Sequence, residues 1–94
     1  MSNFLTRVEL HDAKYEDYVK LHAAMGKEGF LMTITGGNGI VYKMPTAEYC
    51  KTGNYVLNDV VQSGKKAANT VGKSYEIIVG ECSNLQWDGL PPVK

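Results

Sequence analysis

The chain has 94 residues, which fits one domain, and a domain of this size buries only roughly 60% of the surface that its unfolded chain exposes. Ten Lys and Arg residues balance ten Asp and Glu residues, so the chain lacks the positive charge that is typical of a general nucleic-acid binder. A hydrophobic content of 44% and a charged content of 21% are ordinary for a folded globular protein and argue against a disordered chain.

The two cysteines, Cys50 and Cys82, form no CxxC motif, and neither clusters with His11 or His22 at metal-ligand spacing. We therefore expect no metal site and no cofactor. The N-terminus has no basic segment followed by an apolar one, and no stretch reaches the roughly 18 apolar residues of a membrane span. These features favour a cytoplasmic protein whose thiols stay reduced.

Residues 4–10 alternate between apolar and polar side chains over the length of a strand. Successive side chains of a strand point to opposite faces, so this segment would supply both faces of a sheet. We expect it to be the central strand. The two faces are Phe4, Thr6, Val8 and Leu10 on one side, and Leu5, Arg7 and Glu9 on the other.

A helix is predicted from about residue 13 to residue 27, with Asp12 as its N-cap and Gly29 just after its end. Apolar and aromatic side chains recur there at three- and four-residue intervals, which predicts one buried stripe. The members of this stripe are Tyr15, Tyr18, Leu21, His22 and Met25.

Residues 30–35 and 40–44 are rich in β-branched and large apolar side chains, and Gly36-Gly37-Asn38-Gly39 between them is typical of a hairpin turn. Pro45 cannot donate a backbone hydrogen bond, so it indicates a bulge, an edge or a break. The extended segment either ends there or resumes through residues 47–50.

A loop at residues 51–54 leads into a second helix, which we expect to begin between Asn54 and Asn58. We choose Asn54 as its cap, with Asn58 as the alternative. Small side chains on its inward stripe would let this helix lie close to a sheet, and Gly72 would close it. Residues 75–82 then form the last strand. The small residues are Gly64, Ala67 and Ala68.

The order strand, helix, strand, strand, helix, strand predicts an α+β, ferredoxin-like βαββαβ domain over residues 1–82. Its four-stranded antiparallel sheet would have the order 4-1-3-2, with both helices on one face and the other face open. Residues 83–94 are predicted to be a C-terminal tail that adds a strand at a dimer interface through Trp87 and Leu90. We therefore expect a homodimer.

Several segments, taken together, make the chain resemble the small bacterial family of GhoS-type antitoxins. They are residues 7–11, 18–25, 29–30, 42–49, 53–54 and 75–81. The resemblance implies a dimeric, ferredoxin-like endoribonuclease that is similar in fold to the nuclease of CRISPR adaptation and that cleaves the mRNA of a membrane-active toxin. The chain departs from the family pattern at Val56, where Thr is usual, and at Asp88, where an aromatic residue is commoner.

Metal-free RNA cleavage requires a general base for the 2′-OH, an acid for the leaving oxygen and a cation for the phosphate. Arg7, Glu9 and His11 share the open face of the first strand and are the candidate catalytic residues. Glu76 should lie beside Glu9. The two carboxylates are either a pair that holds a cation for metal-assisted cleavage or solvated charges that Arg7 or Lys73 balances. The alternative to a catalytic role for His11 is that of a turn residue. His22 is expected to be a half-buried packing residue.

Base stacking requires exposed aromatic side chains. We expect Tyr42, Tyr49 and Lys43 to bind RNA or a protein partner. Two functions from different classes stay open. One is the RNA-cleaving antitoxin, and the other is a non-catalytic inhibitor from a phage or mobile element that binds a protein through the open sheet face, a free edge or the tail.

Overall fold

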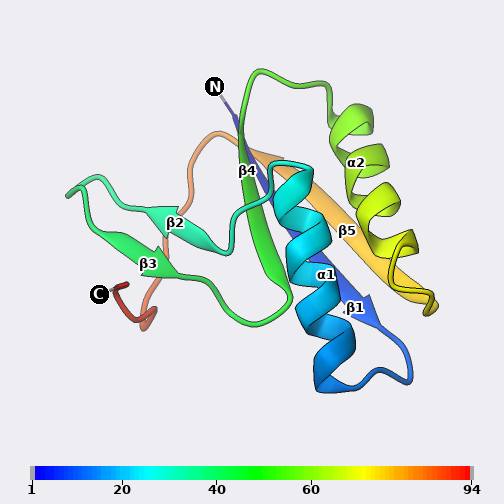
Figure 1. Cartoon of the computed structure of the whole chain (residues 1–94). Helices are drawn as coiled ribbons and strands as arrows, with labels where there is room; N and C mark the ends of the chain where they lie inside the picture. Colours follow the sequence, from blue (N-terminus) through cyan, green and yellow to red (C-terminus); the bar gives the residue numbers. More distant parts are fainter. Residues whose placement is uncertain (1, 94) are drawn as a thin grey trace.

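The computed structural model describes residues 2–93, and its elements are shown in Figure 1. In chain order they are β1 (Ser2–Leu10), α1 (Tyr15–Lys27), β2 (Thr33–Thr35), β3 (Val41–Lys43), β4 (Glu48–Gly53), α2 (Leu57–Asn69) and β5 (Tyr75–Cys82). The strands form a three-stranded antiparallel sheet in the order β4-β1-β5 and a separate two-stranded hairpin of β2 and β3. The predicted α+β class is confirmed.

β1 is the central strand, as its alternation predicts. Phe4, Thr6 and Val8 are fully buried, whereas Arg7 and Glu9 on the opposite face are exposed. Figure 1 shows α1 and α2 in front of the same face of the sheet. One side of the sheet therefore carries the core, and the predicted segregation of both helices to one side is confirmed. The buried core comprises Phe4, Val8, Leu10, Leu21, Met25, Phe30, Tyr49, Val60, Ala67 and Ala68.

α2 lies close to the sheet because its inward face is built from small residues. A Cβ added at Gly64 would lie 2.6 Å from Cδ1 of Ile77 on β5, so glycine permits the approach that is seen. Ala67 and Ala68 are buried on the same side of the helix. The predicted role of these small residues is confirmed. Over residues 2–93, no helix combines the length and apolar character that crossing a membrane requires.

The predicted N-cap of the first helix is wrong. α1 begins at Tyr15, and its first turn is closed by Asp17, whose carboxylate accepts the Lys14 backbone N–H at 2.9 Å. Asp12 instead takes a positive φ of 51° in the turn before the helix. Tyr15 is exposed and does not belong to the buried stripe.

α2 begins at Leu57, with Val56 as an N-cap that makes no side-chain hydrogen bond, and neither Asn54 nor Asn58 has the capping role. The predicted loop at residues 51–54 is for the most part strand, because β4 continues to Gly53.

The single four-stranded sheet of order 4-1-3-2 is also wrong. Pro45 and the positive φ of 67° at Ala47 break the predicted third strand into β3 and β4, and β4 takes the place beside β1. The predicted second strand pairs with β4 only where Leu31 and Cys50 exchange two backbone hydrogen bonds of 2.9 and 2.8 Å. Beyond that point β2 turns away and pairs with β3.

The C-terminal tail folds back onto the hairpin of the same chain. Its backbone bridges β3, because the Lys43 N–H donates to the Pro91 carbonyl and the Val93 N–H donates to the Val41 carbonyl, both at 2.8 Å. Trp87 packs edge to face on Tyr42, with ring centroids 5.5 Å apart. The tail therefore has a docking place within its own chain.

Candidate functional site

The face of the three-stranded sheet that the helices leave open carries the charged side chains of β1. Arg7 and Glu9 lie there beside Glu76 and Ile78 of β5. These four residues line a shallow depression of about 240 Å³ together with Ile77, whose side chain packs on the helix-covered face. The β1–β5 register places Arg7 opposite Ile78 and Glu9 opposite Glu76. The structure thus brings Arg7 and Glu9 to one site and adds Glu76 to it.

His11 completes this group at the end of β1. Its backbone N–H donates to the Ser74 carbonyl at 2.9 Å, which extends the strand pairing by one residue and fixes the position of the side chain. The imidazole Nε2 lies 3.0 Å from Glu76 Oε1, whereas Nδ1 lies 3.4 Å from the Ser74 hydroxyl. A carboxylate on one ring nitrogen orients the imidazole and leaves the other nitrogen for proton transfer.

The charges around this pair are mostly negative. Arg7 Nη1 lies 3.7 Å from Glu48 Oε1 of β4, so the charge of Arg7 is partly neutralised. Glu9 and Glu76 face each other across the strands, as the sequence predicts. Among residues 2–93, no three or more His, Cys, Asp or Glu side chains are placed together to hold a metal ion.

Tyr49 was expected on the surface, and that expectation is wrong. It lies opposite Thr6 on the helix-covered face and is 0% exposed. Its hydroxyl lies 2.7 Å from His22 Nδ1, and burial, with a smaller effect of Tyr18, raises the pKa of the phenol. Burial also lowers the pKa of His22. Both groups are therefore neutral near pH 7, and His22 is the half-buried packing residue that the sequence predicts.

Tyr42 and Lys43 lie on β3, in the other sheet. Lys43 is exposed on the hairpin, and Tyr42 is half-buried between the hairpin and the tail. The Tyr42 hydroxyl accepts the Asn38 side-chain amide at 3.2 Å. These two residues are therefore separate from the group around His11. Leu90 lies in a third place, in an apolar cavity of about 280 Å³ that it lines together with Leu5 and Trp87.

A cleft of about 400 Å³ opens beside Tyr42 and Trp87, and no sequence pattern indicated it. Its two aromatic rings are 45 positions apart in the chain, and no local pattern joins them. The side-chain amides of Asn38 and Gln86 and the backbone of Gly36 also line this cleft. Rings together with amide groups form a surface on which a planar, hydrogen-bonding group can rest.

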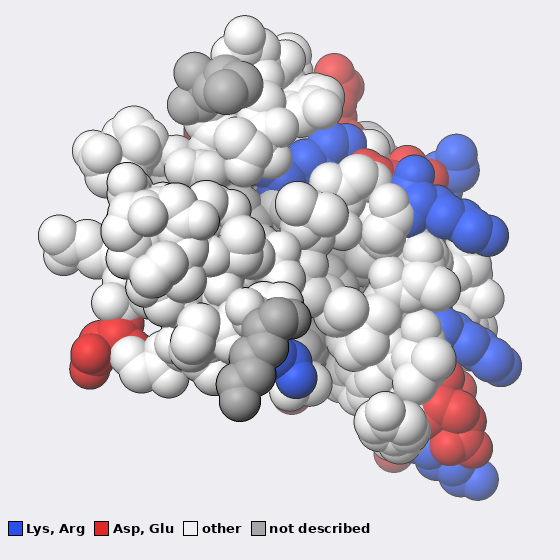
Figure 2. Space-filling view, turned by 60° about the vertical axis from the view of Figure 1, so that its left-hand side comes forward, with Lys and Arg blue, Asp and Glu red and all other residues white. Residues whose placement is uncertain are grey.

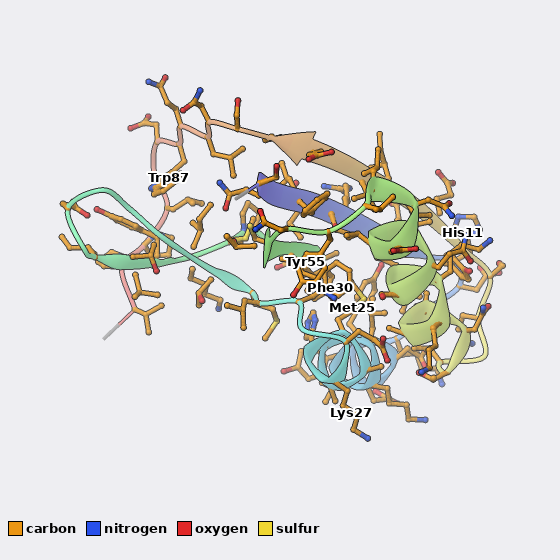
Figure 3. All side chains as sticks on the ribbon, turned by 90° about the horizontal axis from the view of Figure 1, so that it is seen from above. His11, Met25, Lys27, Phe30, Tyr55 and Trp87 are labelled. Atoms are coloured by element: carbon orange, nitrogen blue, oxygen red, sulfur yellow. The ribbon has the colours of Figure 1, made fainter. Side chains whose placement is uncertain are left out.

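Figure 3 shows His11 and Trp87 at opposite ends of the sheet. The residues between them on the open face of β1 are Leu5, Arg7 and Glu9, of which Leu5 shares a cavity with Trp87. From Leu5 to His11 the strand rises by roughly 20 Å, which is the span of a few nucleotides. The open face thus joins an aromatic cleft at one end to an imidazole–carboxylate pair at the other.

No protein-family model, curated protein or solved structure matches the chain.

Proposed function

We propose that the chain is a cytoplasmic RNA-cleaving protein of the antitoxin type, which cuts single-stranded RNA without a metal ion on the open face of its sheet. The observation that carries this proposal is the 3.0 Å contact between His11 Nε2 and Glu76 Oε1. The pair leaves His11 Nδ1 as an exposed proton acceptor at the end of β1. The resemblance to GhoS-type antitoxins supports the same activity.

In the proposed reaction His11 Nδ1 takes the proton of a ribose 2′-OH, and the Glu76 carboxylate holds the resulting imidazolium through the Nε2–H. The 2′ oxygen attacks the neighbouring phosphorus, and the bond from phosphorus to the 5′ oxygen breaks. The 5′ oxygen takes its proton from solvent, which leaves a 2′,3′-cyclic phosphate on the upstream fragment. The site is exposed, so water reaches the leaving oxygen.

Arg7 positions the RNA in this proposal. It lies four residues from His11 on the same strand, a rise of roughly 13 Å, which is too far for both side chains to serve one phosphate. It is suited to a neighbouring phosphate. Because Arg7, the cation that lines the depression, is not next to His11, the acceleration comes chiefly from proton transfer, which is typically worth roughly 10²- to 10⁴-fold. A slow, selective nuclease is the expected result.

Base contacts compensate for the excess of carboxylates. Glu9, Glu48 and Glu76 surround Arg7 and repel phosphate groups, whereas the cleft beside Tyr42 and Trp87 accepts an unstacked base. Stacking of a base on an aromatic ring is worth about 1–3 kcal/mol. We expect RNA recognition to depend on bases in that cleft more than on phosphate charge.

The test is a cleavage assay on single-stranded RNA with the purified chain. His11→Ala and Glu76→Gln should each slow cleavage by at least tenfold while the circular dichroism spectrum stays that of the parent chain. Lys65→Ala, which changes an exposed residue of α2 outside the site, is the matched control and should cleave at the parent rate. Equal rates for all four proteins would contradict the assignment of His11 and Glu76.

A second function is favoured by a different surface. Figure 2 shows few charged side chains over the β2–β3 hairpin and the tail, and apolar side chains are exposed there. Exposed apolar patches of this kind often mark sites of protein contact. The exposed residues of this hairpin patch are Leu31, Met32, Ile40, Val41 and Val93.

The second candidate is therefore a non-catalytic inhibitor that binds a protein through the hairpin patch. Val41→Asp should then abolish capture of a stoichiometric protein partner by the immobilised chain, with His11→Ala as the control that keeps capture. RNA cleavage with no such partner would refute this function and retain the first.

A further inference from the structure

β5 is an edge strand whose outer side has no hydrogen-bonding partner among residues 2–93. The bond from the His11 N–H to the Ser74 carbonyl marks these two residues as a hydrogen-bonded pair, and such pairs alternate along an antiparallel ladder. Glu76, Ile78 and Gly80 therefore turn their backbone groups toward β1. The residues that turn their N–H and C=O groups outward are Tyr75, Ile77, Val79 and Glu81.

Two other sheet edges are covered in part by the rest of the chain, whereas the outer edge of β5 has no backbone partner among residues 2–93. The tail ends the hairpin sheet with Pro92, whose backbone points away from β3 and has no N–H to offer. On the outer side of β4, the backbone of Cys50 pairs with that of Leu31. β5 pairs with β1 without a bulge over its whole length and contains neither Pro nor Lys, two of the devices that prevent strand addition. Its charged residues are Glu76 and Glu81.

We propose that a second copy of this chain pairs with β5 through its own β5, antiparallel about a two-fold axis, to form one continuous six-stranded sheet. The proposal does not depend on RNA cleavage. It also differs from an interface built on Trp87 and Leu90, since the tail stays on its own hairpin.

The backbone limits the register of this pairing. Only outward-facing residues can exchange hydrogen bonds, so odd-numbered residues must oppose odd-numbered residues of the partner. Ile77 opposite Val79 of the partner subunit, and Tyr75 opposite Glu81 of the partner subunit, engage more outward-facing residues than a shift of two positions in either direction. The axis then passes beside Ile78.

Charge and exposure favour the same register. Glu76 would face Gly80 of the partner subunit, so no carboxylate opposes another across the interface. Ile78, which is 70% exposed in the single chain, would contact Ile78 of the partner subunit at a non-hydrogen-bonded position, where side chains are closest. The most exposed aliphatic side chain of the open face is thereby covered.

The pairing also brings two sites onto one surface. Ile78 lines the depression that holds Arg7, Glu9 and Glu76. In the six-stranded sheet the two depressions lie on the same face, one on each side of the axis. Since a glycine faces Glu76, no side chain of the partner subunit fills the depression.

The test is the mass of the full chain measured by light scattering at about 1–100 µM. We expect a concentration-dependent dimer. Ile78→Lys, which places two ammonium groups at the axis, should weaken dimerisation by at least tenfold, and Ile78→Thr should weaken it less. Val41→Lys makes the same change at an exposed position of the hairpin and should leave the dimer intact. A monomer throughout this range, or a dimer unaffected by Ile78→Lys, would overturn the proposal.

Disulfide trapping tests the register separately. In a Cys82→Ser background, Ile78→Cys should give a covalent dimer under mild oxidation. Glu76→Cys, which would face a glycine, should give much less. Equal trapping at both positions would overturn the register.

Discussion

The carboxylates of Glu9 and Glu76 occupy directly opposite positions on β1 and β5. Like charges at such positions destabilise a sheet, and here the nearby His11 imidazole contacts Glu76 and offsets part of the repulsion. The fold thus retains an unfavourable pair at the place where we locate proton transfer. A cost of this kind is expected at a site kept for function.

Removing one of the two charges should stabilise the chain. Glu9→Gln keeps the size and the hydrogen-bonding capacity of the side chain, and we expect it to raise the free energy of unfolding by roughly 0.2–1 kcal/mol. Thermal unfolding at low salt measures the change. The gain should shrink at about 1 M NaCl, where the Debye length is short. A lowered melting temperature would show that Glu9 makes a favourable contact that outweighs the repulsion.

RNA binding should depend on the two aromatic residues of the cleft. Tyr42→Ala or Trp87→Ala should weaken the binding of single-stranded RNA by roughly 5- to 150-fold, the equivalent of about 1–3 kcal/mol of stacking. In the parent chain, the fluorescence of Trp87, the only tryptophan, should be quenched when RNA binds. Tyr15→Ala removes an exposed tyrosine of α1 and should leave the affinity unchanged. Unaltered affinity in Tyr42→Ala would remove the cleft from the proposal.

Acid should destabilise the fold through His22. Burial lowers its pKa from the usual 6.5 in the folded state, so the unfolded chain binds the proton more readily. The contribution of His22 to stability is therefore complete above about pH 6.5 and is lost as the pH falls below that value. Thermal unfolding at about pH 7.5 and pH 5.5 measures the loss.

His22→Gln keeps a partner for the Tyr49 hydroxyl and should reduce the loss of stability on acidification. His11→Gln leaves His22 in place and should retain that loss, so it serves as the control. An identical acid response in the parent chain and in His22→Gln would show that protonation of His22 does not limit stability.

Lys51 should be a structural residue. Its ammonium group donates to the Glu28 carbonyl at the end of α1 at 2.8 Å and lies 4.5 Å from the centre of the Tyr55 ring. Lys51→Met keeps the aliphatic stem and should lower the free energy of unfolding by about 1–2 kcal/mol, through loss of the hydrogen bond and the cation–π contact. Urea unfolding measures the change, and Lys65→Met, at an exposed position of α2, is the control. Equal free energies of unfolding for the two variants would show that the contacts of the Lys51 ammonium group make no net contribution to stability.

Local periodicity predicted the parts of the fold that depend on neighbours in sequence. The alternation in residues 4–10 gave the central strand and its two faces, and β5 spans the predicted residues 75–82. The sequence left a bulge, an edge and a break open at Pro45. The choice among them depends on which strand the segment after Ala47 pairs with. The helix caps were missed because Asp12 and Asn54 have a stronger intrinsic preference for the N-cap position than the residues that are found there. The first turn of α1 is closed by Asp17, and Val56 is the N-cap of α2.

The candidate site was predictable along one strand and not across the fold. Arg7, Glu9 and His11 share a face by parity alone, and the neighbouring position of Glu76 followed from the order of the elements. Tyr49 was misplaced because its face is set by its register with Thr6. The cleft of Tyr42 and Trp87 depends on how the tail folds back, and no short-range pattern encodes that contact.

The most direct measurement is cleavage of a single-stranded RNA in EDTA, compared with the same strand carrying 2′-deoxyribose at every position. We expect the purified chain to cut the RNA, to leave a 2′,3′-cyclic phosphate and to spare the deoxy strand. We expect a preparation of His11→Ala to have lost this activity. Intact RNA, or cutting of both strands alike, would contradict the proposal that His11 and Glu76 activate a 2′-OH.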